Sequence, residues 1–174
     1  MRFKKDRVAV MPDTASSLSA SKDRLRLWLR FLKASRKIEA QLRDRMRAEF
    51  GTTLPRFDVM AALDRSPNGL KMSELSKVLR VSNGNITGIV DRLVEDGLAE
   101  RKAVPGDRRA SRVGLTKLGR KQFAALASAH EAWIDDMLSD FSADEAVMFA
   151  TRLNQLHESL AGNAAENSDS PGHL

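Results

Sequence analysis

The chain has 174 residues, of which 42% are hydrophobic and 30% are charged, a composition that suits one apolar core and helices with long solvated faces. It has no cysteine, which excludes disulfide bonds, thiolate metal sites, cysteine nucleophiles and thiol redox sensing. No apolar run approaches the ~18 residues that span a bilayer, and residues 1–12 lack the apolar stretch of a signal peptide, so we expect a cytoplasmic protein.

The charge balance is basic, with 29 Lys and Arg against 23 Asp and Glu and a pI near 10.0. Such a balance is compatible with a polyanionic partner, but many basic proteins bind no nucleic acid. Whether the partner is a nucleic acid therefore has to be judged from where the charges lie along the chain.

The first fifty residues predict an arm followed by a long helix. Residues 1–20 mix basic residues with Ser and Thr, and we expect them to form a flexible arm. From about Lys22 to Phe50 apolar residues recur at helical spacing: Leu25, Trp28, Leu29, Leu32, Ile38, Leu42 and Met46. Pro55 then stands in the first turn of a second helix, which ends at the breaker-rich residues 66–69.

The next segment predicts a helix-turn-helix. A short amphipathic helix begins near Met72, and Ser82 is the candidate N-cap of a longer helix that Gly97 ends. One side of the longer helix is apolar, and the other carries Asn83, Thr87 and Asp91 with Gly84 and Gly88 beside them. Each glycine costs about 1 kcal/mol of helix stability relative to alanine, which is easier to understand if a bulky surface must approach closely.

Two kinds of DNA contact follow from this segment, and one alternative stays open. Lys71 and Ser73 stand at the start of the first helix of the pair and are candidate phosphate contacts. Asn and Thr side chains on the second helix can hydrogen-bond base edges or phosphates. The alternative is a helical hairpin with an ordinary solvated face.

A basic β-hairpin is predicted after the second helix. Leu98–Val104 and Arg112–Leu115 are strand candidates joined by residues 105–109. Between Arg101 and Arg112, both included, five cationic residues stand against one carboxylate, that of Asp107: Arg101, Lys102, Arg108, Arg109 and Arg112. Such a wing can lie on phosphates or place an arginine in the minor groove, although a solvated turn would carry the same charges.

The C-terminal part predicts two more helices, one capped by Thr116 and the other beginning at Ser142. The order of elements predicts a mainly α fold with a small β-hairpin wing, a winged helix-turn-helix with long terminal helices. We divide the chain into a flexible arm (residues 1–20), a DNA-binding lobe (55–116), dimerisation helices on either side of the lobe (21–50 and 117–160) and a disordered tail (161–174). The terminal helices cannot bury their apolar stripes on so small a lobe, which favours a two-fold homodimer.

Two stretches resemble a known family. The run DRRASRVGLT at residues 107–116 is similar to the wing signature of the MarR family of bacterial regulators, and SNGNITGIVDRLVEDG at residues 82–97 is similar to its recognition helix. With the flanking helices the likeness covers about residues 22–160. It implies a homodimeric, sequence-specific transcription regulator, a repressor, on double-stranded DNA with a pseudo-palindromic operator.

The resemblance also implies roles for individual residues. The major groove would be met by Asn83, Gly84, Asn85 and Thr87, beside the cap residue Ser82. Arg109 would enter the minor groove, with Arg108 and Arg112 as further contacts of the basic wing. Asp107 would position a neighbouring arginine through a salt bridge.

An effector pocket between the lobe and the dimerisation helices is a further implication of the resemblance. Its candidate lining is mostly apolar: Trp28, Phe31, Arg36, Phe57, Met60, His130 and Trp133. Arg36 can instead pair across the dimer, and the aromatic, Met and His side chains can instead be core. Residues 54–63, 71–76 and 130–133 resemble the branch that controls hydroxycinnamate catabolism, which implies an aromatic acid or an aromatic acyl-CoA such as p-coumaroyl-CoA, its phosphates held by Arg24, Arg26, Arg30 and Arg36.

No pattern in the sequence indicates an enzyme or a cofactor. The three histidines, His130, His157 and His173, do not have the spacing of metal ligands, and no serine stands in a nucleophile turn. We therefore expect no catalytic residue, metal or cofactor. Two other functions remain open beside the ligand-responsive regulator: a constitutive DNA-binding protein without an effector, and a winged helix that docks protein partners.

Overall fold

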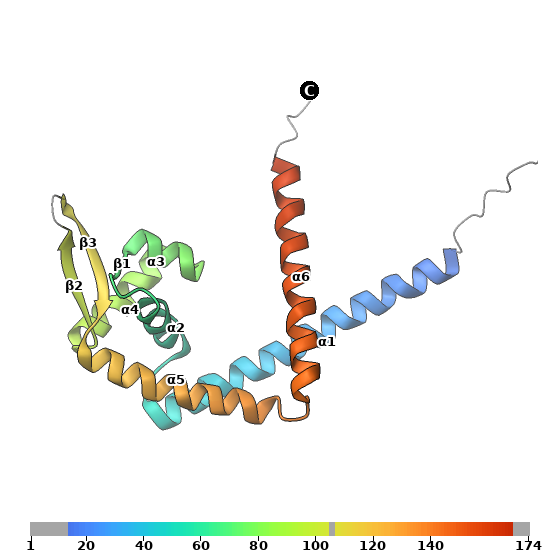
Figure 1. The fold of residues 1–174 in the computed structure, drawn as a ribbon, viewed down its shortest axis with the longest axis horizontal. Helices are drawn as coiled ribbons and strands as arrows, with labels where there is room; N and C mark the ends of the chain where they lie inside the picture. Colours follow the sequence, from blue (N-terminus) through green and yellow to red (C-terminus); the bar gives the residue numbers. More distant parts are fainter. Residues whose placement is uncertain (1–13, 105–106, 169–174) are drawn as a thin grey trace, which may run out of the picture. The chain divides into compact units, whose positions relative to one another are not determined.

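The computed structural model describes residues 14–104 and 107–168, and their side chains other than those at 14–18, 83, 104, 107–110 and 163–168. The elements follow in the order α1 (Thr14–Phe50), α2 (Leu54–Asp64), β1 (Leu70–Lys71), α3 (Met72–Leu79), α4 (Asn83–Glu95), β2 (Ala99–Val104), β3 (Asp107–Leu115), α5 (Lys117–Met137) and α6 (Ala143–Ser168) (Figure 1). They form two compact units, one up to Phe123 and one from Ala124. The predicted mainly α fold with a small β wing is confirmed.

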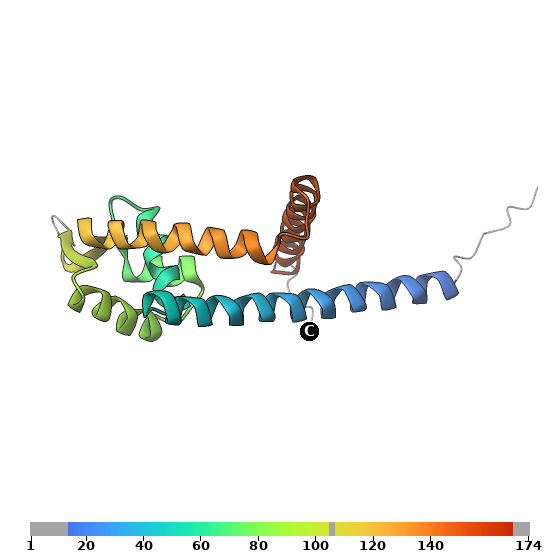
Figure 2. The same cartoon turned by 90° about the horizontal axis from the view of Figure 1, so that it is seen from below.

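The terminal helices extend further than the sequence predicted. Helix α1 begins at Thr14, inside the segment expected to be a flexible arm, and Figure 2 shows it as one unbroken helix. Helix α6 continues to Ser168, inside the expected tail. Once a helix is nucleated, each further residue adds one hydrogen bond, so Ala- and Ser-rich ends can continue it. Residues 1–13 and 169–174, which complete the predicted arm and tail, lie outside the described residues.

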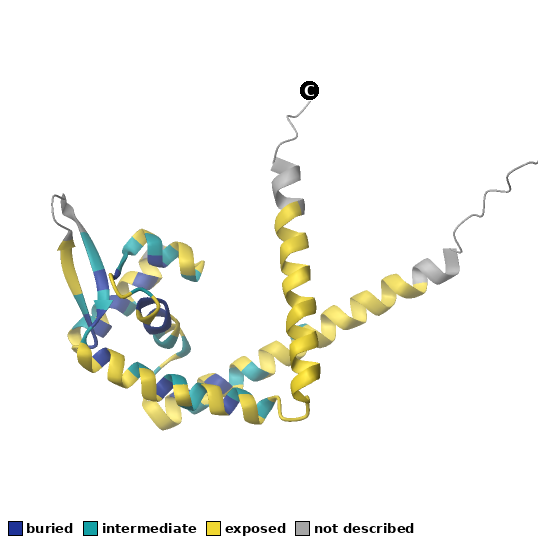
Figure 3. Ribbon diagram, viewed as in Figure 1, coloured by how far each residue is buried: buried dark blue, intermediate teal, exposed yellow. Residues whose placement is uncertain are grey.

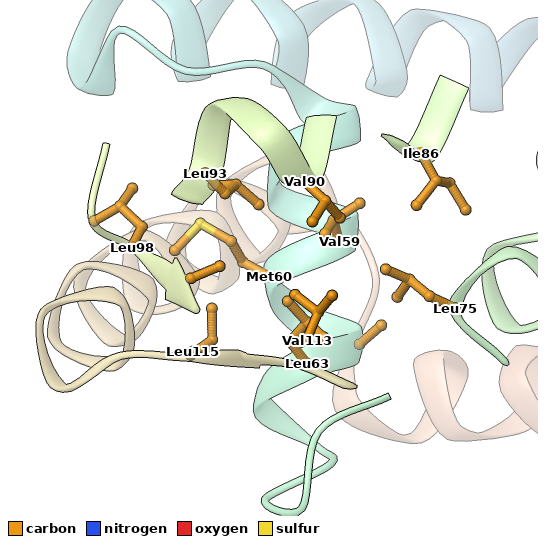
Figure 4. Close-up of a cluster of buried hydrophobic side chains, with 12 residues drawn as sticks. Val59, Met60, Leu63, Leu75, Ile86, Val90, Leu93, Leu98, Val113 and Leu115 are labelled. Atoms are coloured by element: carbon orange, nitrogen blue, oxygen red, sulfur yellow. The ribbon is translucent and has the colours of Figure 1, made fainter. Parts of the chain in front are cut away.

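The core of the first unit joins three helices to the sheet (Figure 4). It consists of twelve buried apolar residues: Val59, Met60, Ala62 and Leu63 of α2, Leu75 of α3, Ile86, Val90 and Leu93 of α4, and Leu98, Ala99, Val113 and Leu115 of the sheet region. Each large side chain that is removed from water contributes roughly 1.5–3 kcal/mol. Burial on one face therefore fixes the rotation of α4 about its own axis.

The sheet has three antiparallel strands in the order β1-β3-β2. Strand β1, which the sequence did not predict, pairs Leu70 with Val113 and Lys71 with Arg112. Strand β3 begins at Asp107 and not at Arg112, because Val104 already pairs with Asp107. The prediction that residues 107–109 belong to the turn was therefore wrong: their backbone is part of the strand, and the intervening residues 105–106 lie outside the described residues.

The start of α5 is fixed by a cap and a close approach. Gly119 N donates to Thr116 Oγ1 at 2.9 Å, which confirms the predicted cap, and the Thr116 hydroxyl donates to Gly97 O at 2.8 Å. A Cβ on Gly119 would collide with the carbonyl oxygen of Leu98. The first turn of α5 therefore lies directly on the backbone that leads into the wing, in a place that only glycine fits.

In the second unit, α6 begins with a capping box. Ser142 N donates to Glu145 Oε2 at 2.9 Å, and Glu145 N donates to Ser142 Oγ at 3.3 Å. The Ser142 hydroxyl also donates to Glu145 Oε2 at 2.8 Å. The bonds that Ser142 N and Ser142 Oγ donate to this carboxylate lower the pKa of Glu145, so the cap is complete above the ordinary pKa of glutamate and is lost as the pH falls through the lowered value. The predicted helix start at Ser142 is thus confirmed.

Helices α1 and α6 expose many large apolar side chains. Trp28 and Phe31 of α1 are 55% and 47% exposed, and α6 exposes Val147, Met148, Phe149, Leu153, Leu156 and Leu160. Figure 3 shows α6 exposed along its described length, and α1 exposed over the described part of its N-terminal half. None of the helices in the described ranges is long and apolar enough to cross a membrane.

Candidate nucleic-acid interface

The outward face of α4 carries two exposed glycines. Ile86, Val90 and Leu93 are fully buried on the inward face, and Gly84 and Gly88 are exposed on the opposite side. A Cβ at either glycine would meet no atom within 4 Å, and neither glycine has a positive φ. Neither the packing nor the backbone conformation of the subunit thus requires glycine here, and the helix backbone is open to a partner at van der Waals distance.

The N-terminus of α4 presents polar groups beside these glycines. Ser82 occupies the N-cap position, as predicted, with φ −63° and ψ 147°, but its hydroxyl makes no capping hydrogen bond. Asn85 and Thr87 are exposed in the first turns, and Asn83 is the first helical residue, with its side chain outside the described set. The helix N-terminus carries partial positive charge and free N–H groups, which favour an anion such as phosphate.

The turn between α3 and α4 is held by the subunit itself. Arg80 ends α3 in the left-handed conformation with φ 53°, and Ser76 Oγ donates to Val81 O at 2.7 Å. A non-glycine residue in this region costs free energy that surrounding contacts must offset. The turn directs the chain into α4 at a fixed angle.

The N-terminus of α3 is already partly occupied by a carboxylate. Lys71 N donates to Glu74 Oε2 at 2.8 Å, so this backbone donor is satisfied within the subunit. Ser73 is exposed in the first turn, and Lys71 is half-buried. The groups that α3 can offer to a phosphate are therefore its side chains rather than this amide.

Arg112 binds within the subunit. Its Nη1 donates to Gly69 O at 2.7 Å and lies 3.5 Å from Glu74 Oε2. The guanidinium thus connects strand β3 to the loop before β1 and to the first turn of α3. The contact lets the Arg112 side chain position the wing, and the direct DNA contact expected for Arg112 stays a prediction.

A second ion pair, which the sequence did not predict, connects α4 to the wing. Arg101 Nη2 of β2 donates to Asp91 Oδ1 at 2.6 Å. Both side chains are partly exposed, so the pair fixes orientation more than it adds stability. The sequence feature that could have predicted this pair is the opposite charge of Asp91 and Arg101, which lie ten residues apart on a helix and on the strand that follows it.

The tip of the wing carries the remaining predicted contacts. Asp107, Arg108 and Arg109 are the first three residues of β3. Their side chains are among those that the structure does not describe, so the roles expected for them stay predictions. Their backbone places them at the end of the hairpin that is remote from the start of α5 (Figure 1).

The residues predicted to line an effector pocket are distributed over both units. Met60 is 3% exposed inside the core, and the Phe57 ring packs against Phe123 with centroids 5.6 Å apart and the rings tilted by 34°. Trp28, Phe31 and Arg36 are exposed on α1. In the second unit, His130 is half-buried and Trp133 is 7% exposed. Met60 is thus a core residue, which is the alternative that the sequence left open for it.

The described residues offer no metal site: no three of their His, Asp or Glu side chains come together in a way that could hold an ion. A shallow hollow in the second unit is lined by Ser128, Glu131, Ala132 and Asp135. None of the predicted effector-binding residues lines it.

Comparisons with known proteins agree on one family. Residues 50–110 match the family model described as MarR family. The chain is 30% identical over 125 residues to the transcriptional activatory protein BadR of Rhodopseudomonas palustris, covering 66% of this chain and 71% of BadR.

Solved structures extend the likeness to the fold. A MarR family transcriptional regulator from Silicibacter pomeroyi is 31% identical, with a TM-score of 0.67 and coverage of 81% of this chain and 97% of that one. A point mutant of MarR from E. coli, solved in complex with operator DNA, is 25% identical, with a TM-score of 0.65 and coverage of 77% of this chain and 95% of that one.

Proposed function

Because the chain belongs to the MarR family of DNA-binding transcription regulators, which are not enzymes, we propose that the outward face of α4 enters the major groove of DNA. The wing then contacts the flanking phosphate backbone of the duplex. The observation that carries the proposal is the pair of exposed glycines, Gly84 and Gly88, which nothing inside the subunit requires. Asn83, Asn85 and Thr87 are the proposed base-edge contacts, with Ser82, Lys71, Ser73 and Arg108 on phosphates.

The functional form is proposed to be a homodimer. The exposed apolar residues of α1 and α6 need cover, and a second copy supplies the same surfaces in return. A two-fold dimer presents two α4 helices, so the operator is a pseudo-palindrome with half-sites about one helical turn, roughly 34–36 Å, apart.

The test of this function is selection of bound sequences from random duplexes at physiological salt. We expect a two-fold symmetric motif, and an affinity that falls steeply between about 50 and 200 mM salt because bound cations are released from the phosphates. Binding without sequence enrichment would indicate a non-specific DNA binder. No binding at either salt concentration would indicate that the winged helix docks protein partners instead.

Arg109→Ala is expected to weaken binding to DNA of any sequence. An arginine in the minor groove or on a phosphate contributes through charge, so its loss lowers the slope of log affinity against log salt by about one unit. Gel-shift titrations at two salt concentrations measure this, with Arg65→Ala as the control because Arg65 is an exposed arginine at the end of α2. If Arg109→Ala and Arg65→Ala bind alike, Arg109 does not contact DNA.

We further propose that the dimer represses by excluding other proteins from the duplex it covers, and that an aromatic acid or aromatic acyl-CoA releases it. The proposal is supported by the resemblance of residues 54–63 and 130–133 and by the exposed cations of α1. Adding p-coumaroyl-CoA or feruloyl-CoA to the preformed complex should free the duplex in a gel shift, with free coenzyme A as the control. A complex that persists with every acyl-CoA would instead describe a constitutive DNA binder.

A further inference from the structure

Two helix ends in the first unit carry a charge of the sign that a helix end disfavours. Arg56 is a cation in the first turn of α2, and Asp96 is a carboxylate at the C-cap of α4. The helix macrodipole favours the opposite signs at these positions, because a helix N-terminus is partly positive and a C-terminus is partly negative. Neither charge is thus explained by the helix to which it belongs.

These two charges form an ion pair with each other. Arg56 Nη2 donates to Asp96 Oδ2 at 2.5 Å, between residues that are 40 positions apart in the sequence. The Arg56 side chain is 21% exposed, and its Nε is buried without a hydrogen-bond partner among the described residues. A buried donor that has no partner costs free energy. The stability of the first unit therefore does not by itself account for the pair.

Both partners of the pair are attached to backbone that the fold holds in place. Helix α2 contributes four residues to the core of the first unit, and Phe57, the residue after Arg56, packs against Phe123 of α5. At the end of α4, Asp96 N donates to Arg92 O at 2.9 Å, so the backbone of Asp96 still belongs to the last turn of the helix. A change in the pair therefore acts on the whole of α4 and not on one side chain alone.

Asp96 lies at the end of α4 that is opposite to the proposed base contacts. Helix α4 has 13 residues, so it is about 20 Å long, and a tilt of about 5° at one end displaces the other end by roughly 2 Å. Hydrogen bonds from N–H to O vary in length by only about 0.5 Å. Burial of one face fixes the rotation of α4 about its axis, whereas its tilt needs directional contacts, because apolar contacts are non-directional. Asp91 supplies one such contact in the middle of the helix, and Asp96 supplies one at the end.

We infer that Arg56 is a positioning residue for sequence recognition: by holding Asp96 it fixes the tilt of α4, and with it the places of Asn85 and Thr87 against the base edges. The inference rests on the proposed binding of α4 in the major groove, and it adds a residue that acts through α4 without touching DNA. Base-edge contacts carry the sequence information, whereas phosphate contacts do not. Loss of the pair therefore lowers the affinity for the operator more than the affinity for other duplexes.

Two neighbouring substitutions in the full-length protein test the inference by the sign of their effects. Asp96→Ala and Glu95→Ala each remove one carboxylate from the same end of α4, and Glu95 has no side-chain hydrogen bond or ion pair within the described part of the chain. Removal of negative charge by itself favours binding to DNA. Glu95→Ala should therefore bind a selected operator, measured by fluorescence anisotropy, at least as tightly as wild type. Asp96→Ala should bind it about tenfold more weakly, because the tilt of α4 is no longer fixed.

Variants of Arg56 test the other partner of the pair. Arg56→Gln should also bind the operator about tenfold more weakly, but a duplex of unrelated sequence by no more than about twofold. Its slope of log affinity against log salt should equal that of wild type, whereas loss of a direct phosphate contact would lower the slope by about one unit. Arg56→Lys keeps a cation beside Asp96 and should recover most of the operator affinity. The double variant with Arg56→Gln and Asp96→Ala should bind no more weakly than either single variant, because each already breaks the pair.

The outcomes are distinguishable. Wild-type affinity of both Asp96→Ala and Arg56→Gln for the operator overturns the inference and leaves α4 in the major groove. Equal losses on the operator and on the unrelated duplex overturn it too, because the pair would then act only through the stability of the fold, which urea unfolding measures. A lowered salt slope for Arg56→Gln assigns Arg56 to a phosphate instead, and losses that add in the double variant show that the two residues act separately. A wild type that enriches no sequence refutes the proposed function, and this inference with it.

Discussion

Gly88→Glu is expected to abolish most DNA binding while it slightly stabilises the protein. Glutamate is a better helix former than glycine by roughly 0.5 kcal/mol, and the space around Gly88 is open within the subunit. The same side chain would place a negative charge on the face of α4 that we propose to meet the duplex. Repulsion from the phosphates and loss of close approach should together lower the affinity on the order of a hundredfold.

The measurement combines urea unfolding with fluorescence anisotropy on a selected operator duplex. Gly88→Ala is the graded comparison, since alanine tests close approach without charge. Gly162→Glu is the matched control, because Gly162 is another helical glycine, in α6, with no atom within 4 Å of an added Cβ. Equal affinity of Gly88→Glu and Gly162→Glu would mean that the outward face of α4 does not contact DNA.

Gly119→Ala is expected to destabilise the first unit by about 3 kcal/mol, at the upper end of the cost of overpacking a core. The new Cβ would collide with the carbonyl oxygen of Leu98. That oxygen cannot move away cheaply, because it accepts a hydrogen bond from Thr116 N at 3.0 Å and the Leu98 side chain is buried in the core. Either α5 must shift or the strand that leads into the wing must shift.

Urea unfolding followed by circular dichroism measures this loss, with Gly162→Ala as the control that should gain stability. At temperatures where Gly119→Ala remains folded, displacement of the wing should also weaken operator binding. An unfolding midpoint equal to that of wild type would show that the start of α5 can adjust without cost, and that the close approach is not needed to place the wing.

Local patterns in the sequence predicted most of the fold and the main surface of the site. Helix hydrogen bonds and caps join residues three or four positions apart, so the amphipathic runs, Thr116 and Ser142 carried enough information to place the helices. The same periodicity separated the buried side of α4 from the side that carries Gly84 and Gly88. The family followed from two short runs of residues for the same reason.

Contacts between distant residues were decided only by the tertiary structure. Strand β1 exists because Leu70 and Lys71 find partners more than forty positions away in β3, and neither residue signals that pairing. Arg112 is a surface charge in the sequence, yet it binds Gly69 O, and Gly119 is an ordinary helical glycine until Leu98 O lies against it. The sequence by itself determined which helix faces are apolar, which carry exposed glycines and which are charged, because those properties belong to single helices. Which atoms meet across elements depends on the packing of the whole unit, and only the folded chain decides it.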